Sequence, residues 1–445
     1  MRKEMKSVTK LGGSVLLAAL VLVGQAPEAH AYGPEGLFGG RPMPDSSIVL
    51  GNPVELRNDR PERAESVLEH PRPDYDGVPY QLGSFEIFPT MELGETYDSN
   101  IYVESSGGRG DAIGTIRPIV NAFSNWGRHA LSLTTFGDIN FYSQHPDENY
   151  KNVVVDANGR YDILDQTWAS VRGGYQRLAE SRTSPNAVNG SEPTTFGVAK
   201  GGVTFYRGAG KLKANADYDY KRFDYDETPS LTGPIDQSER DRNEHVMGGK
   251  LAYEVTGNLT PYVRGAYNMR DYDKNPTHES DGFDAVAGVN ADFGGITSLD
   301  LYAGWMEQYY DKFPVKKTIS SPKIGGRLDW NVTGLTSVVL EADRTIEETT
   351  LTGYNSYYQT GGSVTVTHEL LRNVLLEGNV AYSESEFNGS GDREDQLLST
   401  GLGMRYLINR SLYTDVLYSW DHRYSTDDTA EYTRHMGTVR LGVHL

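Results

Sequence analysis

The clearest chemical pattern in this sequence is the alternation of charged and apolar side chains. In the segment 412–421, Asp415 and Asp421 share one parity, whereas Val416 and Trp420 share the other. In an extended strand this alternation gives one polar face and one apolar face. If the apolar face meets lipid, the polar face lines an interior. The charged residues predicted on that inner face are Asp156, Arg160, Arg172, Lys213, Asp217, Asp219, Lys250, Arg264, Asp284, Asp292, Asp300, Arg327, Asp329, Glu341, Glu377, Arg405, Asp415 and Arg440.

Two compatible roles are open to these inward charges. They can pair with opposite charges on neighbouring strands and stiffen the wall, or they can line a polar conduit that selects solutes by charge and hydrogen bonding. Inward aromatic rings can stack on sugar rings or simply fill space. The predicted inward or rim aromatics are Tyr142, Phe223, Tyr262, Tyr302 and Tyr413.

Motifs typical of catalysis and cofactor binding are missing from the sequence. The ten histidines include no HExxH spacing and no pair suited to a metal, and Gly107-Gly108 lacks the lysine of a phosphate-binding loop. The absence of cysteine excludes disulfides, thiolate metal sites and a lipid-modified N-terminal cysteine. We therefore expect no enzyme activity, no metal and no cofactor. The net charge of -19 argues against a nucleic-acid partner.

The first residues predict export through the Sec pathway. A basic start with Arg2 and Lys10 precedes the apolar run 15–23, and Ala29-His30-Ala31 supplies small residues at a cleavage site. The apolar run is shorter than the roughly 20 residues of a membrane helix. We predict a signal peptide over 1–31 that is cleaved near Ala31.

Residues 32–84 are rich in Pro, Gly and charge and predict irregular structure. Two interpretations of this segment remain open. It is either a flexible periplasmic leader or a plug that folds into the mouth of a pore.

From residue 85 to 445, alternating segments of roughly 11 to 17 residues are separated by turn signals, with no persistent helical period. Eight tight connections are predicted at 126–128, 164–166, 208–210, 256–258, 294–296, 333–335, 370–372 and 408–410. Nine longer polar connections are predicted near 103–111, 145–150, 180–194, 227–241, 273–281, 311–321, 348–355, 387–394 and 425–433.

This strict alternation of short and long connections is typical of outer-membrane barrels, with short periplasmic turns and longer external loops. A soluble sandwich or propeller does not need it. The mean hydropathy of -0.54 by itself describes a soluble protein, but barrel strands are half polar and escape that test. We predict an all-β, transmembrane, antiparallel up-and-down β-barrel of about eighteen strands in the cell outer membrane, with both termini in the periplasm.

One short motif adds a family resemblance. The run Tyr97-Asp98-Ser99-Asn100-Ile101-Tyr102 resembles a signature of the β-barrel porin 2 family, which is associated with exopolysaccharide and capsule biosynthesis. The resemblance implies an outer-membrane barrel that takes part in exporting a surface polysaccharide. The implied partners are outer-membrane lipid, the barrel-assembly machinery, and periplasmic and inner-membrane export proteins. From the residues alone, Asp98, Ser99 and Asn100 favour a turn that shapes the first external loop.

Three functions therefore stay open. The first is a conduit for polysaccharide export, and the second is a diffusion porin for small polar solutes. A porin needs a loop folded into its lumen, and 180–194 and 227–241 are the candidates. The third is a structural or adhesin-like barrel, which a fully occluded lumen would favour.

Overall fold

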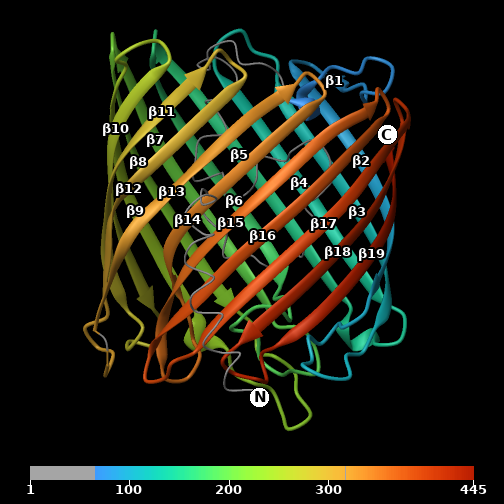
Figure 1. Ribbon diagram of the computed structural model, residues 1–445, viewed down its shortest axis with the longest axis vertical. Coiled ribbons are helices and arrows are strands. Elements are labelled where there is room, and N and C mark those ends of the chain that lie inside the picture. Colours follow the sequence, from blue (N-terminus) through green and yellow to red (C-terminus); the bar gives the residue numbers. More distant parts are fainter. Residues whose placement is uncertain (1–65, 316) are drawn as a thin grey trace, which may run out of the picture.

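The computed structural model describes residues 66–315 and 317–445, which form a closed antiparallel β-barrel (Figure 1). Strands β2 to β19 run up and down, each hydrogen-bonded to its neighbours in sequence, and β19 pairs with β2 to close the wall. The predicted all-β barrel of about eighteen strands is confirmed. The predicted signal peptide over 1–31 and most of the segment 32–84 lie outside the described residues.

The wall strands are β2 (Phe85–Asp98), β3 (Asp111–Ser124), β4 (Ala130–Tyr142), β5 (Tyr150–Leu164), β6 (Thr167–Ala179), β7 (Thr195–Ala209), β8 (Leu212–Tyr225), β9 (Arg242–Tyr253), β10 (Leu259–Tyr272), β11 (Ser280–Phe293), β12 (Thr297–Tyr309), β13 (Thr318–Thr333), β14 (Thr336–Glu348), β15 (Tyr354–Leu371), β16 (Val374–Gly389), β17 (Glu394–Asn409), β18 (Leu412–Ser425) and β19 (Tyr432–His444). The short strand β1 (Tyr80–Leu82) pairs with the start of β2. Single 3-10 turns are η5 (Val67–Glu69), η6 (Pro146–Glu148) and η7 (Ser238–Arg240).

Each of the eight predicted tight turns joins two consecutive strands at one end of the barrel, the upper end in Figure 1. The longer connections gather at the other end. The connection predicted near 387–394 is present but shorter, because β16 runs to Gly389 and β17 begins at Glu394, and the one predicted near 311–321 ends earlier because β13 begins at Thr318. Phe387 packs its ring against Tyr354 and Tyr357 of β15, at centroid distances of 5.6 and 5.0 Å, and this contact extends the pairing.

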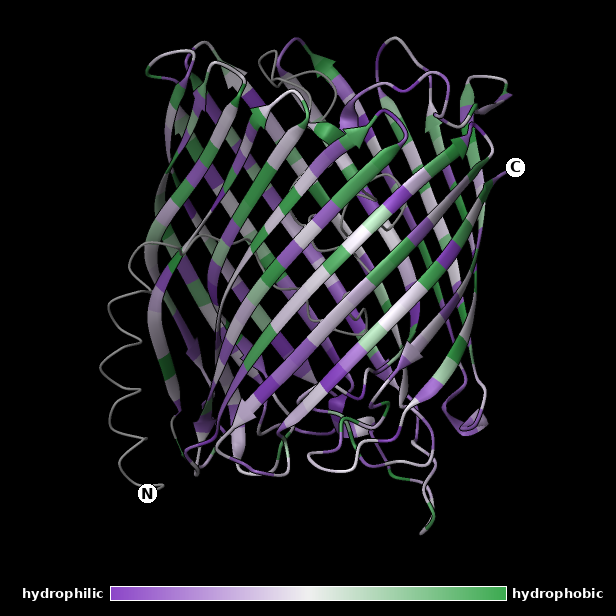
Figure 2. Ribbon diagram, turned by 45° about the vertical axis from the view of Figure 1, so that its right-hand side comes forward, coloured by the Kyte–Doolittle hydropathy of each residue, from purple (hydrophilic) through white to green (hydrophobic). Residues whose placement is uncertain are grey.

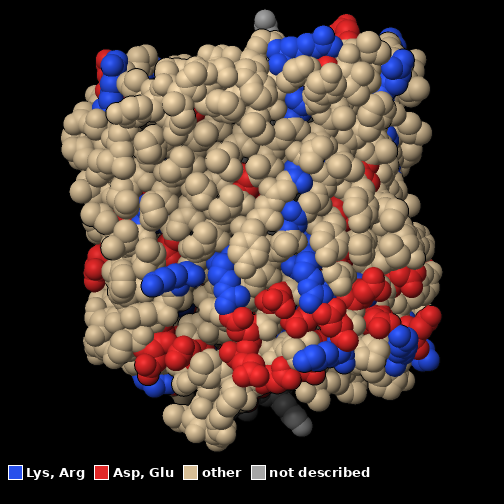
Figure 3. All heavy atoms as spheres, turned by 180° about the vertical axis from the view of Figure 1, so that it is seen from behind, with Lys and Arg blue, Asp and Glu red and all other residues tan. Residues whose placement is uncertain are grey.

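The two faces of the wall differ as an outer-membrane strand requires. Apolar side chains such as Val171, Leu402 and Val439 project outward and are more than half exposed in the isolated chain, where lipid would cover them. Polar side chains alternate with them and point inward, so green and purple bands follow one another along each strand in Figure 2. In Figure 3, acidic side chains gather near the end that carries the long loops.

Three inward tyrosines lie over glycines of the neighbouring strand and bind a carboxylate one strand further on. The Tyr262 ring covers Gly288 and donates its hydroxyl to Asp300 at 2.7 Å. The same arrangement joins Tyr302, Gly325 and Asp343, with a hydroxyl distance of 2.9 Å. In the third case the Tyr413 ring of β18 covers Gly442 of β19 and donates its hydroxyl to Glu92 of β2. Each tyrosine therefore ties three consecutive strands together.

We predict that Gly442→Val destabilises the barrel by about 2 kcal/mol, the usual cost of overpacking. A Cβ at Gly442 would lie 2.0 Å from Cζ of Tyr413, so the ring must leave its place above the closing strands. The measurement is urea unfolding of the detergent-folded protein, followed by tryptophan fluorescence. Gly437→Val on the same strand is the control, because nothing lies within 4 Å of its Cβ. Equal loss of stability in both variants would contradict the prediction.

Candidate permeation pathway

The structure places all the charged residues predicted to line the lumen on the inward parity of their strands. Contacts that cross the interior identify this face, since side chains from distant strands can meet only inside the barrel. The predicted residues are distributed as follows: Asp156 and Arg160 on β5, Arg172 on β6, Lys213, Asp217 and Asp219 on β8, Lys250 on β9, Arg264 on β10, Asp284 and Asp292 on β11, Asp300 on β12, Arg327 and Asp329 on β13, Glu341 on β14, Glu377 on β16, Arg405 on β17, Asp415 on β18 and Arg440 on β19.

Six inward charges of alternating sign form a ladder across the place where the barrel closes. The ladder consists of Arg405, Asp415, Arg440, Glu92, Arg117 and Asp138. Arg440 bridges the closing strands, with Nη1 3.6 Å from Glu92 and 3.8 Å from Asp415. Sequence reasoning found the half of the ladder on β17–β19 but missed the half on β2–β4. Glycine, threonine and proline interrupt the apolar alternation in β2 and β3. The sequence therefore indicates less clearly which side chains of these two strands face inward.

Other inward charges also pair along the wall. Arg172 binds Asp219 at 2.6 Å, and Lys200 binds Asp156 at 2.9 Å. Arg327 forms ion pairs with both Asp329 and Glu341. Nζ of Lys213 lies 3.1 Å from Oε2 of Glu254. Glu377 accepts a hydrogen bond from Thr367 at 3.4 Å. These side chains bond sideways to their neighbours, which leaves a polar surface of mixed sign facing the interior.

The inward aromatics belong to this wall. Cations cover three of the five predicted rings: Lys250 lies 3.9 Å from the centre of the Tyr262 ring, and Arg242 and Arg405 lie over the remaining two, Phe223 and Tyr413. A cation covers only one face of a ring, but Phe223, Tyr262 and Tyr413 are also buried, so no ring face is free to stack on a sugar. The hypothesis that these three rings stack on sugars is therefore not supported by their geometry. The Tyr302 hydroxyl donates a hydrogen bond to Asp343. Near the rim, the ring centroids of Tyr142 and Tyr150 lie 6.4 Å apart.

The loop 180–194, which joins β6 to β7, crosses the lumen at the end that carries the long loops. Asn186 accepts hydrogen bonds from the Thr349 hydroxyl at 2.7 Å and from the Thr350 amide at 3.2 Å. These threonines belong to the β14–β15 connection, which lies nearly opposite in the ring of strands. Arg423 of β18 donates to the carbonyl of Thr183, from a third side of the lumen. The loop is thus held from several directions.

Two ion pairs fix the base of the same loop. Arg182 binds Glu148 at 2.6 Å, and Arg240 binds Glu180 through two hydrogen bonds of 2.6 and 2.9 Å. Burial alone would lower the pKa of Arg240, but Tyr225 and Glu180 raise it above its ordinary value, so this guanidinium stays charged. Bidentate pairs of this kind restrict geometry as well as adding binding energy.

The end of β14 forms a second inward element. Glu348 accepts hydrogen bonds from Tyr272 at 3.0 Å and from Tyr310 at 2.6 Å, and it pairs with Arg270. Arg270 and Tyr272 belong to β10, four strands away from β14, and Tyr310 directly follows β12, two strands away. A pocket between this element and loop 180–194 is lined by both, including Asn186 and Thr349.

The motif 97–102 lies at the loop end of the closing strands. Asp98 pairs with Arg434 of β19, and the Asn100 side chain donates to the carbonyls of Glu104 at 2.9 Å and Thr433 at 3.1 Å. The Ser99 hydroxyl accepts the amide of His435 at 2.8 Å. Ile101 is buried, while Tyr97 projects outward and Tyr102 lies beneath the Arg109 guanidinium. The motif therefore shapes the loop between β2 and β3 and fastens it to β19.

Comparisons with known proteins agree with this architecture. The sequence matches the family described as Putative beta-barrel porin 2 over residues 72–445. No curated protein matches this chain. Among solved structures, OpdL of Pseudomonas aeruginosa is 12% identical and has a TM-score of 0.43, with 82% of this chain and 100% of that chain covered.

Two further structures show a comparable likeness. The outer membrane protein opdK of Pseudomonas aeruginosa is 11% identical with a TM-score of 0.45, covering 81% of this chain and 99% of that chain. OccAB3 of Acinetobacter baumannii is 10% identical with a TM-score of 0.43, and the match covers 82% of this chain and 100% of that chain. These likenesses concern the barrel fold alone.

The chain belongs to the Putative beta-barrel porin 2 family, as the motif in the first strand predicted. It is an outer-membrane β-barrel of the porin class. Within residues 66–315 and 317–445, no group of three or more histidine and acidic side chains could hold a metal ion.

We predict that Arg440→Ala destabilises the barrel by about 3 kcal/mol, because it leaves two buried carboxylates, Glu92 and Asp415, without a shared cation. Urea unfolding measures the change. Arg327→Ala is the matched control: its side chain is 39% exposed, so the expected loss is below about 1 kcal/mol. Similar losses for the two variants would show that the ladder has no special role at the closing strands.

Proposed function

We propose that this protein is a diffusion porin for small polar solutes, with loop 180–194 as its constriction. The observation that carries the proposal is the crossing of the lumen by this loop, from its base at β6 and β7 to Thr349 and Arg423. Barrels of 16 to 18 strands leave an aqueous channel because their own side chains cannot fill it. Selectivity in such a barrel must therefore come from segments folded inward.

The inner surface supports the same proposal. Its charges are largely paired with neighbours on the wall, as Arg172 is with Asp219. A surface of paired charges and hydroxyl groups attracts polar solutes without holding one sign of charge tightly. Passage through a porin needs weak binding of this kind, because a tightly held solute would not leave.

Polysaccharide export, which the motif suggested, stays a prediction. A polymer in transit would occupy the lumen along its whole length and would have to displace loop 180–194. The ion pairs of Arg182 and Arg240 and the contacts of Asn186 oppose that displacement. For this reason we place small-solute diffusion ahead of export. Transport through the Sec pathway, insertion by the barrel-assembly machinery and contacts with export proteins remain expectations.

We predict that shortening the loop by removal of residues 183–190 raises single-channel conductance severalfold in planar bilayers and admits larger neutral sugars into proteoliposomes. The deletion removes Asn186 and the Thr183 carbonyl, and with them the contacts to the far wall. Folding is checked by the shift in electrophoretic mobility on heating.

The matched control removes residues 230–233 from the neighbouring loop, whose tip carries the fully exposed Leu231. This deletion should leave conductance unchanged. An unchanged conductance in the 183–190 deletion would contradict the assignment of the constriction.

A separate measurement addresses export. We predict that cells lacking this protein keep normal amounts of surface polysaccharide but take up a small neutral sugar more slowly. Loss of surface polysaccharide that wild-type protein restores would favour export and would contradict the porin proposal.

A further inference from the structure

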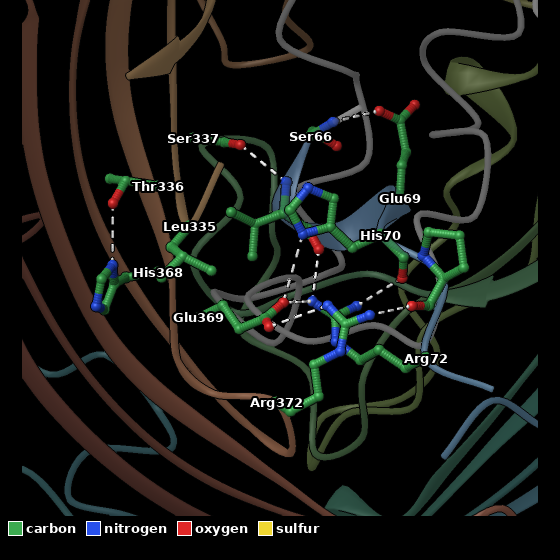
Figure 4. A network of polar contacts seen from close by, with 12 residues as sticks. Ser66, Glu69, His70, Arg72, Leu335, Thr336, Ser337, His368, Glu369 and Arg372 are labelled. Atoms are coloured by element: carbon green, nitrogen blue, oxygen red, sulfur yellow. Dashed lines mark hydrogen bonds and ion pairs between the residues drawn. The ribbon is translucent and has the colours of Figure 1, made fainter. Parts of the chain in front are cut away.

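A segment ahead of the barrel lies inside its periplasmic mouth. Residues 66–77, which we call the mouth segment, include η5 and lead to β1 (Figure 4). The permeation pathway described above makes no use of them.

An apolar contact and a backbone hydrogen bond seat the start of the mouth segment on the inner wall. Val67 is 1% exposed and packs with Leu375 of β16 and Leu417 of β18. Its amide donates to the Ser337 hydroxyl of β14 at 2.9 Å. Leu417 lies five residues beyond the start of β18 at Leu412, so at ~3.3 Å per residue and a tilt of ~45° it is roughly 12 Å inside the mouth.

One buried guanidinium both folds the mouth segment and binds it to the wall. Arg72 donates from Nη2 to Glu369 at 2.5 Å and to the Val67 carbonyl at 2.7 Å, and from Nη1 to the His70 carbonyl at 3.1 Å. Its side chain and that of Glu369 are each 4% exposed. A carboxylate and two carbonyls thus bind the two terminal nitrogens of a charged group that water scarcely reaches.

Two turns at the mouth hold the next residues. Arg372, between β15 and β16, donates to the Pro71 carbonyl at 2.8 Å, and Arg410, between β17 and β18, donates to the Pro73 carbonyl at 2.6 Å. The segment then passes His444 at the end of β19, where Gly77 leaves room for the imidazole. It therefore follows the inside of the mouth from β14–β16 to the closing strands.

Glu369 differs from other inward carboxylates near the mouth. Asp162 occupies the corresponding place, two residues before the end of β5, and pairs with Arg160 of its own strand at 2.8 Å. Glu369, two residues before the end of β15, pairs with Arg372 of the adjoining turn at 3.4 Å and, in addition, binds the cation of a segment that is not part of the wall.

We propose that the mouth segment is a second constriction, which limits the size of the solutes that pass the periplasmic mouth, and that Glu369 is its anchor on the wall. The proposal rests on the proposed diffusion function. Loop 180–194 and the mouth segment would then act in series, at opposite ends of one lumen.

The test compares Glu369→Ala and Arg72→Ala with Asp162→Ala in the full-length protein, by single-channel conductance and by proteoliposome swelling in neutral sugars of increasing size. Releasing the segment should raise conductance and the size limit in the first two variants. Asp162→Ala should behave as wild type, because its loss leaves the mouth segment in place. Heat-modified mobility shows that each variant is folded.

Exchanging the two charges tests whether the ion pair between Arg72 and Glu369 itself holds the mouth segment in place. Arg72→Glu and Glu369→Arg should each open the mouth. The double variant R72E/E369R restores the ion pair but not the bonds from position 72 to the Val67 and His70 carbonyls, so it should return conductance part of the way to the wild-type value. If the wild-type protein conducts and all these variants have the same conductance as the wild type, the mouth segment is not a constriction. The porin proposal then still stands. If neither wild type nor the released variants conduct, both proposals are overturned.

Discussion

The pairing of β19 with β2 is the contact on which the rest of this structure depends. Lipid offers no hydrogen-bond partners, so each backbone amide and carbonyl of a membrane sheet must find one within the sheet. A row of strands leaves two unpaired edges until its first and last members meet. Here they pair from Thr90 with His444 to Asp98 with Met436.

Side chains reinforce that closure at three levels. At the loop end, Asp98 pairs with Arg434. In the middle, the Thr96 and Thr438 hydroxyls bond at 2.8 Å, and Arg440 joins Glu92 to Asp415. At the end that carries the tight turns, the Thr90 hydroxyl and the His444 imidazole are hydrogen-bonded at 3.1 Å. The motif that resembles the family signature and the six-residue charge ladder thus both serve the closing strands. Closing a ring of this size also leaves a lumen that inward segments must narrow.

The alternation of side chains predicted the wall well, because lipid on one side and water on the other impose a period of two on each strand. Residues such as Asp415 and Arg440 could be assigned to the inner face for that reason. Glu92 and Arg117 could not be assigned to it, because neighbouring glycine, threonine and proline interrupt the two-residue alternation of apolar and polar side chains. The role of Asn186 was also out of reach, since its partner Thr349 is distant in sequence. For the mouth segment, proline and glycine predicted irregular structure but could not indicate that Arg72 would find Glu369.

We propose a wide, charge-paired lumen that folded segments narrow from within. Its most direct test is the swelling rate of proteoliposomes carrying wild-type protein, measured with a series of neutral sugars from monosaccharide to long oligosaccharide. The account predicts rapid entry of the smallest sugars and a steep fall with size. Equal rates for short and long sugars, or no entry of any sugar, would contradict it.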